Sequence, residues 1–275
     1  MHSSQRQFWK MTGSGNDFVF FDARHDPSGD LERPESIAAV CDRRMGVGAD
    51  GVVFLESDPA NAFSIRYFNR DGSLAELCGN ASLCSVALAA DLKIVAAGER
   101  FTFGTSSGAL TGIFTAAGPR IGMPAVVDGS MAFFTNLAAG EERVGYARVG
   151  VPHLVVLCQD VDRIDVENRG RELRFLPSLP GGANANFVSR RDGAWTYRTY
   201  ERGVEEETLA CGSGSVAVAA LLRGWGLAEG TVSLRTRSGA TLSICFDGSQ
   251  PTLAGEGRLV FEGRLRDIKP HWTTE

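Results

Sequence analysis

The sequence predicts an α+β fold built from two copies of one unit. Short runs of β-branched and aromatic residues, typical of strands, recur along the 275-residue chain, whereas helical stretches are few. An internal repeat is the second observation: a strand, a turn and a Cys-Gly pair at the start of an Ala-rich helix occur twice. Because this length suits two domains of roughly 100–200 residues, we expect one domain per copy.

The elements can be assigned in chain order. Apolar runs predict strands at 18–21, 52–55, 154–157, 242–246 and 259–261. A helix is predicted from Pro34 to Cys41, because proline suits the first turn of a helix. Two more helices are predicted after Cys78 and Cys211, where Ala-rich residues continue to Leu92 and Gly224.

Three pairs of segments carry the repeat. Segment 48–55 resembles 150–157, and segment 65–70 resembles 197–202. The pattern Cys-Gly-polar-small-Ser then opens an Ala-rich helix at 78–82 and again at 211–215. Similar apolar strings arise easily by chance, so the cysteine segments are the stronger sign of two similar domains.

The composition excludes several classes of partner. The net charge is −5, so no basic surface is expected that would gather nucleic acid or anionic lipid. No segment approaches the ~18 apolar residues of a membrane span, and the N-terminus lacks the apolar core of a signal peptide. We therefore expect a cytoplasmic protein that binds a small molecule and has no nucleic-acid or membrane partner.

The six cysteines fall into two groups. No CxxC pair and no histidine at zinc-finger spacing occurs, so neither a metal site nor a disulfide framework is expected. Four cysteines are interpreted as packing residues: Cys41, Cys84, Cys158 and Cys245. The remaining two open the Ala-rich helices of the repeat.

A cysteine at a helix N-terminus has a distinctive chemistry. The unpaired N–H groups and the positive end of the helix dipole lower a thiol pKa from about 8.5 toward neutrality, and they can also hold a carboxylate. Two such cysteines suggest a thiolate base and a thiol acid that act on opposite sides of one carbon, as in racemisation or epimerisation. The alternatives are ordinary helix-start residues, a redox pair, or a non-catalytic module of the same fold.

Motifs spread over nearly the whole chain resemble those of the diaminopimelate epimerase family. They are KMTGSGNDF at 10–18, DRRMGVGADG at 42–51, the segment 69–80 around the first cysteine and the segment 184–214 around the second. The resemblance implies an isomerase of lysine and peptidoglycan precursor biosynthesis. It would convert LL-2,6-diaminopimelate to the meso form with no cofactor, neither pyridoxal phosphate nor metal. A related racemase acting on another amino acid, such as histidine, is the alternative.

The resemblance also implies roles for single residues. Cys78 and Cys211 would be the acid/base pair. The backbone around four residues would hold the α-carboxylate: Gly79, Asn80, Gly212 and Ser213. Five residues would bind the far end of the substrate: Asn16, Asn69, Asn184, Glu201 and Arg202. His153 would lie near the substrate amine, although its place after a proline equally suits a core histidine; Asn16 and Asn69 could equally shape turns, and Glu201-Arg202 could be a surface pair.

The implied fold consists of two pseudo-symmetric α/β domains, each a curved, mostly antiparallel sheet around a central helix, with the active site in the cleft between them. The expected bounds are 1–120 plus 264–275 for the domain with Cys78, and 121–263 for the domain with Cys211. Because family members are often dimers, a homodimer is expected. Three departures from the family pattern leave the substrate open: Ala81, Leu83 and Val151.

Overall fold

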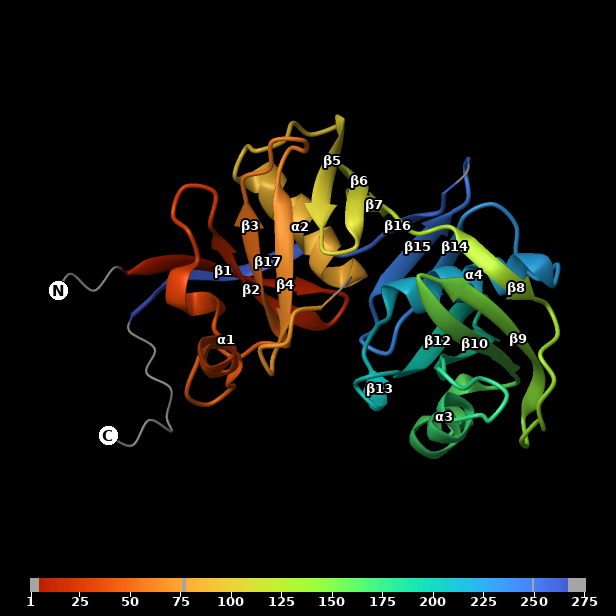
Figure 1. The fold of residues 1–275 in the computed structure, drawn as a ribbon. Coiled ribbons are helices and arrows are strands. Elements are labelled where there is room, and N and C mark those ends of the chain that lie inside the picture. Colours follow the sequence, from red (N-terminus) through yellow and green to blue (C-terminus); the bar gives the residue numbers. More distant parts are fainter. Residues whose placement is uncertain (1–4, 76–77, 249, 267–275) are drawn as a thin grey trace. The chain divides into compact units, whose positions relative to one another are not determined.

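The computed structural model describes residues 5–75, 78–248 and 250–266 and confirms the α+β class. The chain divides into two compact units, 1–121 with 256–275 (unit 1) and 122–255 (unit 2) (Figure 1). The sequence-based boundary at 264 falls inside the last strand, so the chain returns to unit 1 earlier, at 256. Residues 267–275 and the motif residues 76–77 lie outside the described part.

The described residues of unit 1 form one sheet with two α-helices. Its strands follow each other in the order β17 (Arg258–Leu265), β1 (Arg6–Gly13), β2 (Asn16–Asp22), β3 (Gly51–Glu56), β4 (Ser64–Asn69), β5 (Arg100–Thr105), β6 (Gly108–Thr115) and β7 (Gly118–Gly122). Helix α1 (Pro34–Cys41), as predicted, joins β2 to β3 after a 3-10 turn at Gly29–Glu32. Helix α2 (Gly79–Asp91) joins β4 to β5.

Unit 2 repeats this plan. Its strands follow in the order β8 (Val126–Ser130), β9 (Glu141–Val149), β10 (Val151–Cys158), β11 (Asn184–Arg191), β12 (Ala194–Glu201), β14 (Val232–Arg235), β15 (Thr241–Cys245) and β16 (Thr252–Ala254). The short β13 (Glu206–Thr208) adds to β12. A 3-10 turn (Val161–Arg163) and α3 (Val166–Arg174) join β10 to β11, and α4 (Gly212–Gly224) precedes β14.

The two units share one topology. In each order, the third and fourth strands are parallel, as are the fifth and sixth, and every other neighbouring pair is antiparallel. The parallel pairs require crossover connections, which α1 and α3 supply at the first and α2 and α4 at the second. The internal repeat is therefore a duplication of the whole unit.

One predicted pairing within the repeat is wrong. Segments 65–70 and 197–202 lie on β4 and β12, the fifth strands, and do correspond. Segment 150–157 lies on β10, a third strand whose counterpart is β2, whereas 48–55 leads into β3, a fourth strand. Both β3 and β10 are buried apolar runs, and such a run carries no information about its place in a sheet.

Each sheet curves around one buried helix. Helix α2 contacts β17 and β1 at one end of its strand order and β6 near the other, and α4 contacts strands from β8 to β15 (Figure 1). Both helices are apolar nearly all round, as expected of helices without a solvent face. Among the described residues, no helix has the length and apolar character needed to cross a membrane.

Candidate active site

Cys78 and Cys211 are the N-cap residues of α2 and α4. Both have extended backbones, with φ/ψ of −130°/114° and −124°/114°. The Sγ of Cys78 accepts the N–H of Ala81 at 3.5 Å, and the Sγ of Cys211 accepts the N–H of Gly214 at 3.4 Å. An N–H donated to sulfur at the positive end of a helix stabilises negative charge on that sulfur. The same thiol geometry thus occurs once in each unit.

The backbone of Cys211 is held by a buried tyrosine. The Oη of Tyr197 donates to the carbonyl of Cys211 at 2.9 Å and accepts its N–H at 3.2 Å. Burial raises the pKa of Tyr197, so the phenol stays protonated and keeps both roles. The Oγ of Ser213 lies 3.6 Å from the Sγ of Cys211.

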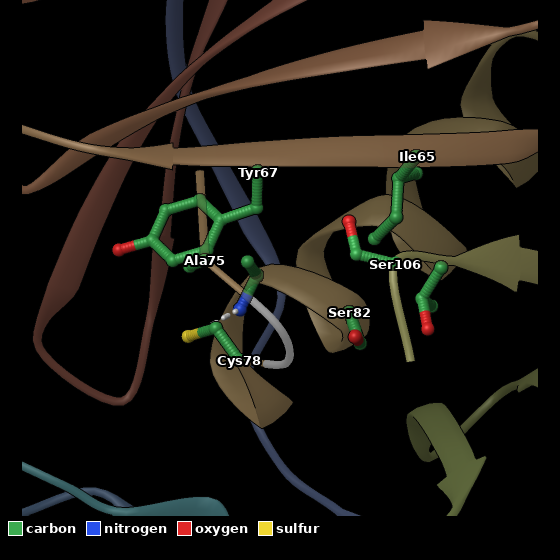
Figure 2. A pocket seen from close by; sticks show the side chains of 8 residues that line it. Ile65, Tyr67, Ala75, Cys78, Ser82 and Ser106 are labelled. Carbon is green, nitrogen blue, oxygen red and sulfur yellow. Dashed lines mark hydrogen bonds between the residues drawn. The ribbon is translucent and has the colours of Figure 1, made fainter. Parts of the chain in front are cut away.

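The corresponding place beside Cys78 holds a small cavity. Ile65 and Tyr67 extend from β4 toward the first turn of α2 (Figure 2). The cavity of about 10 Å³ has room for about one water molecule. Fully buried Ser82 lines it, and its Oγ has no hydrogen-bond partner among the described residues. Segment 65–70 corresponds to 197–202, so Ile65 stands where unit 2 has Tyr197, whose larger side chain reaches the cysteine backbone.

Two separate motifs of unit 1 meet beside the start of α2. The amide Nδ2 of Asn80 donates to the Oδ1 of Asn16 at 2.7 Å, and the Nδ2 of Asn16 donates to Asp50 at 3.1 Å. Arg43 pairs with Asp50 at 2.7 Å and with Asp17 at 2.8 Å. Asn16 therefore does more than shape a turn: it begins β2, and its side chain links the motif at 42–51 to α2.

Asp17 is the charged centre of this network. Buried Lys10 donates to it at 2.6 Å, beside the two contacts from Arg43. Burial alone would raise the pKa of Asp17, but the hydrogen bonds and charges of Arg43 and Lys10 lower it to about 2. The carboxylate is thus ionised at neutral pH and fixes both cations.

Asn69 shapes the turn that follows β4. Its Nδ2 donates to the Oγ of Ser73 at 3.0 Å, and its carbonyl accepts the N–H of Gly72 at 2.9 Å. Gly72 has a φ of +85°, and a Cβ there would lie 2.3 Å from Pro34 Cα. The turn role of Asn69 is therefore present in the structure.

Three predicted residues of unit 2 lie together at the ends of β11 and β12. The Oδ1 of Asn184 accepts the backbone N–H of Arg202 at 2.7 Å. Glu201 accepts from Thr208 at 2.8 Å, and burial raises the pKa of its carboxyl group. Glu201 and Arg202 are each half-buried, so they are not a fully solvated surface pair.

His153 is fully buried on β10 and hydrogen-bonded through one nitrogen. Its Nδ1 lies 3.3 Å from the Nδ2 of Asn186, and its Nε2 has no partner among the described residues. Burial and the charge of Arg202 lower the pKa of His153 to about 3. The ring is therefore neutral at physiological pH.

The other four cysteines have no comparable setting. None of the six cysteines is joined to another by a disulfide. Burial raises the pKa of Cys41 and of Cys158 to about 12, and that of Cys84 well above its usual value, so these three stay protonated. Cys245 donates to Asp247 at 2.8 Å near the end of β15. In the described part of the chain, no cluster of three or more His, Cys, Asp or Glu side chains could hold a metal ion.

Sequence reasoning missed the buried polar residues behind Cys211. They are Asn186, Tyr197 and Thr199. Asn186 follows Asn184 at the two-residue spacing that places side chains on one face of a strand, which was a usable signal. Tyr197 could have been found from the repeat, since it is the polar counterpart of Ile65.

Comparison with known proteins supports one family. The family model described as diaminopimelate epimerase matches residues 8–127 and 145–261. The diaminopimelate epimerase of Gemmatimonas aurantiaca is 46% identical over 95% of this chain and 99% of its own length. That of Aquifex aeolicus is 38% identical over 95% and 98%.

Solved structures support the fold. A phenazine biosynthesis protein of the PhzF family from Bacillus anthracis has a TM-score of 0.72 at 14% identity, over 95% of this chain and 99% of its own. At this identity the likeness concerns the fold alone.

Proposed function

The chain belongs to the diaminopimelate epimerase family, and we propose that it converts LL-2,6-diaminopimelate to the meso form with two thiols. One observation carries the proposal: Cys78 and Cys211 cap two corresponding helices with the same backbone geometry and the same N–H···S contact. Inversion of an α-carbon needs a base that removes the proton and an acid that returns one from the other side. Each unit supplies one thiol suited to these tasks.

The helix starts supply the second requirement, a place for the α-carboxylate. The first N–H groups of a helix have no partner within that helix, and they attract negative charge. We assign the carboxylate to the backbone at Gly79-Asn80 and at Gly212-Ser213. Charge that develops on the carboxylate during deprotonation is stabilised by the same N–H groups.

We assign recognition of the far end of the substrate to polar side chains in both units. Asn16 and Asn69 contribute from unit 1. In unit 2, Asn184 and Glu201 lie beside Arg202, whose guanidinium can grip a carboxylate with two hydrogen bonds. His153, which pairs with Asn184 in the ladder of β10 and β11, is assigned to the substrate near the reacting carbon. Another amino acid is the competing substrate, because the chain departs from the family pattern at Ala81, Leu83 and Val151.

The exposed edge of unit 1 supports a homodimer. Strand β17 ends the strand order, and Leu259, Val260 and Phe261 on it are 38–47% exposed. An edge strand with apolar side chains favours pairing with another chain. We expect light scattering to give the mass of a dimer, and Val260→Glu to shift it toward the monomer. A wild-type monomer at micromolar concentration would contradict this assembly.

Isotope exchange tests the activity. In D2O, without pyridoxal phosphate, the protein should place deuterium at the α-carbon of diaminopimelate and interconvert the LL and meso forms. Cys78→Ala and Cys211→Ala should each lower epimerisation by ~10² or more. Cys245→Ala, which removes a thiol outside the site, is the matched control and should leave the rate unchanged. Epimerisation that survives loss of both capping thiols would refute the mechanism.

A panel of amino acids decides the substrate. Exchange confined to diaminopimelate supports the proposed reaction. Exchange with another amino acid, such as histidine, and none with diaminopimelate would replace it with a racemase of that amino acid.

A further inference from the structure

A buried hydrogen-bond chain runs through β10, β11 and β12 of unit 2. His153 and Asn186 are fully buried, and Thr199 is 1% exposed. The Oγ1 of Thr199 donates to the Oδ1 of Asn186 at 2.9 Å, and the Nδ2 of Asn186 faces the Nδ1 of His153 at 3.3 Å. Burying polar side chains costs free energy unless they are hydrogen-bonded, so such residues are retained where a partner or a ligand uses them.

The amide orientation of Asn186 is fixed by a backbone carbonyl. The side-chain atom that faces the carbonyl oxygen of Leu154 at 2.9 Å must be a donor, so it is Nδ2. The Oδ1 then accepts from Thr199, and the second N–H of Nδ2 points to His153. The Nδ1 of His153 must therefore accept, and its proton is on Nε2.

This assignment leaves a buried donor for a ligand. The Nε2 of His153 is inaccessible to solvent and has no partner among the described residues. An unsatisfied buried N–H is costly, and a fold tolerates it when a ligand completes the hydrogen bond. The lowered pKa of His153 agrees with a ring that remains neutral.

The hydrogen-bond chain also reaches the start of α4, where Cys211 lies. A Cβ placed on Gly214 would lie 2.4 Å from the Oδ1 of Asn186 and 3.2 Å from the Sγ of Cys211. Both atoms thus border the same small space in the first turn of α4. The histidine, the amide and the thiol form one contiguous group within unit 2.

Unit 1 shows that the fold does not require this chain of hydrogen bonds. The strand registers give the counterparts in unit 1: Phe18 for His153, Val53 for Asn186 and Tyr67 for Thr199. In each unit the first lies on the third strand, and the other two face each other across the fourth and fifth. Phe18 packs edge-on against Tyr67 at 5.7 Å. The same topology is therefore stable with apolar and aromatic packing at these positions.

We propose that Asn186 is a positioning residue that holds His153 as a neutral ring with its proton on Nε2, ready to donate a hydrogen bond to the substrate. The proposal rests on the proposed function, because the substrate of that reaction would accept the hydrogen bond from Nε2. Thr199 and Leu154 fix the amide, the amide fixes the ring, and the ring then carries its one N–H on Nε2.

The tautomer can be measured without any activity. In protein labelled with ¹⁵N-histidine, long-range proton–nitrogen spectra distinguish a protonated ring nitrogen from an unprotonated one. The signal of His153 is identified by its loss in His153→Gln. We expect a protonated Nε2 and a bare Nδ1 between pH 5 and 8. A proton on Nδ1, or a charged ring, would overturn the proposal even if the protein is an active epimerase.

Substitution of Asn186 tests the cause. In Asn186→Asp the new carboxylate can only accept, so the proton of His153 should move to Nδ1, or the ring should become charged. We expect kcat to fall about 10- to 100-fold, with a smaller change in KM. Asn136→Asp makes the same change at an exposed position and should leave kcat and the His153 signal as in wild type. An unchanged tautomer in Asn186→Asp would refute the role of the amide.

A double-mutant cycle separates positioning from a structural effect. If Asn186 acts only through His153, adding Asn186→Asp to His153→Gln should lower kcat no further. Multiplying losses would overturn the proposal. Should Asn186→Asp fail to fold, Asn186→Val, which copies Val53 of unit 1, takes its place in the cycle. If wild type exchanges no amino acid, the proposed function fails, while the spectra still decide the tautomer.

Discussion

Replacing Gly214 by alanine would place a methyl group where the first turn of α4 meets Asn186. The new Cβ would lie 2.4 Å from the Oδ1 of Asn186, closer than real contacts allow, and 3.2 Å from both the Cβ and the Sγ of Cys211. The Oδ1 is held by Thr199 and the Nδ2 by the carbonyl of Leu154. The amide therefore cannot rotate away without breaking hydrogen bonds.

Two opposing terms set the magnitude. Alanine is the better helix former by about 1 kcal/mol, which alone would stabilise α4. Overpacking a filled interior costs about 1–3 kcal/mol, and each hydrogen bond lost at Asn186 adds about 1 kcal/mol. We expect a net loss of about 1–2 kcal/mol and a fall in Tm of roughly 2–8 °C. Activity should fall further, because the displaced atoms border the thiol of Cys211.

The duplicated unit offers matched variants. The position of Gly214 corresponds to Ala81 in α2, and that of Asn186 to Val53. Ala81→Gly should cost about 1 kcal/mol by helix propensity alone. Valine has no atom at the place of the Oδ1, so adding Asn186→Val to Gly214→Ala should make room for the new methyl group. The two substitutions should then couple by about 1 kcal/mol or more in stability, while kcat stays low.

Thermal unfolding followed by circular dichroism, with initial rates of epimerisation, measures both quantities. Gly214→Ala variants that melt at or above the wild-type temperature would refute the packing argument. Additive losses in the double variant would show that the methyl group and Asn186 do not compete for the same space.

Other predictions address charge. Burial and Arg202 lower the pKa of His153 from 6.5 to about 3, so the unfolded chain takes up the proton first as the pH falls. This contribution to the free energy of unfolding is complete above pH 6.5 and is lost toward pH 3 by up to ~1.4 kcal/mol per pH unit. Urea titrations at several pH values should show a smaller loss of stability with falling pH in His153→Gln than in wild type. Equal slopes in the two proteins would contradict the neutral ring. Asp17→Asn should cost about 3 kcal/mol or more in urea unfolding, because it leaves buried Lys10 without its carboxylate, and a change below 1 kcal/mol would argue against the ion network. Arg202→Ala should raise the KM of diaminopimelate about 10- to 100-fold, whereas Arg70→Ala at the corresponding, exposed position should leave KM unchanged; equal effects would contradict the assignment.

Local signals in the sequence predicted the parts of the site that depend on one segment. Proline at the first turn placed α1, and the Ala-rich runs after Cys78 and Cys211 placed α2 and α4 with both cysteines at the caps. The duplication was visible for the same reason, because the fifth strand and the following helix lie close in sequence. Helix α3 was missed, since its sequence is strongly polar and resembles a loop.

Contacts between distant segments could not be predicted from such signals. Asn16 and Asp50 meet because β2 and β3 are parallel neighbours, which neither motif specifies. The wrong pairing of 48–55 with 150–157 has the same origin, since two buried strands at different positions in the strand order have the same apolar pattern. The orientation of Asn186 depends on Leu154 of one strand and Thr199 of another, and only the assembled sheet brings these together.

The duplicated unit separates what the fold needs from what differs between its two copies. Strand order, crossovers and the capping cysteine occur in both units, so they belong to the architecture that places a thiol at a helix start. At the corresponding positions, unit 1 has Phe18 and Val53 where unit 2 has His153 and Asn186, and Ile65 where unit 2 has Tyr197. These differences give the two thiols unlike surroundings: Ile65 and Tyr67 border a small cavity beside Cys78, whereas the hydroxyl of Tyr197 holds the backbone of Cys211. Because the polarity around a thiol changes its pKa, we expect the two thiols to differ in acidity although their helices are built alike.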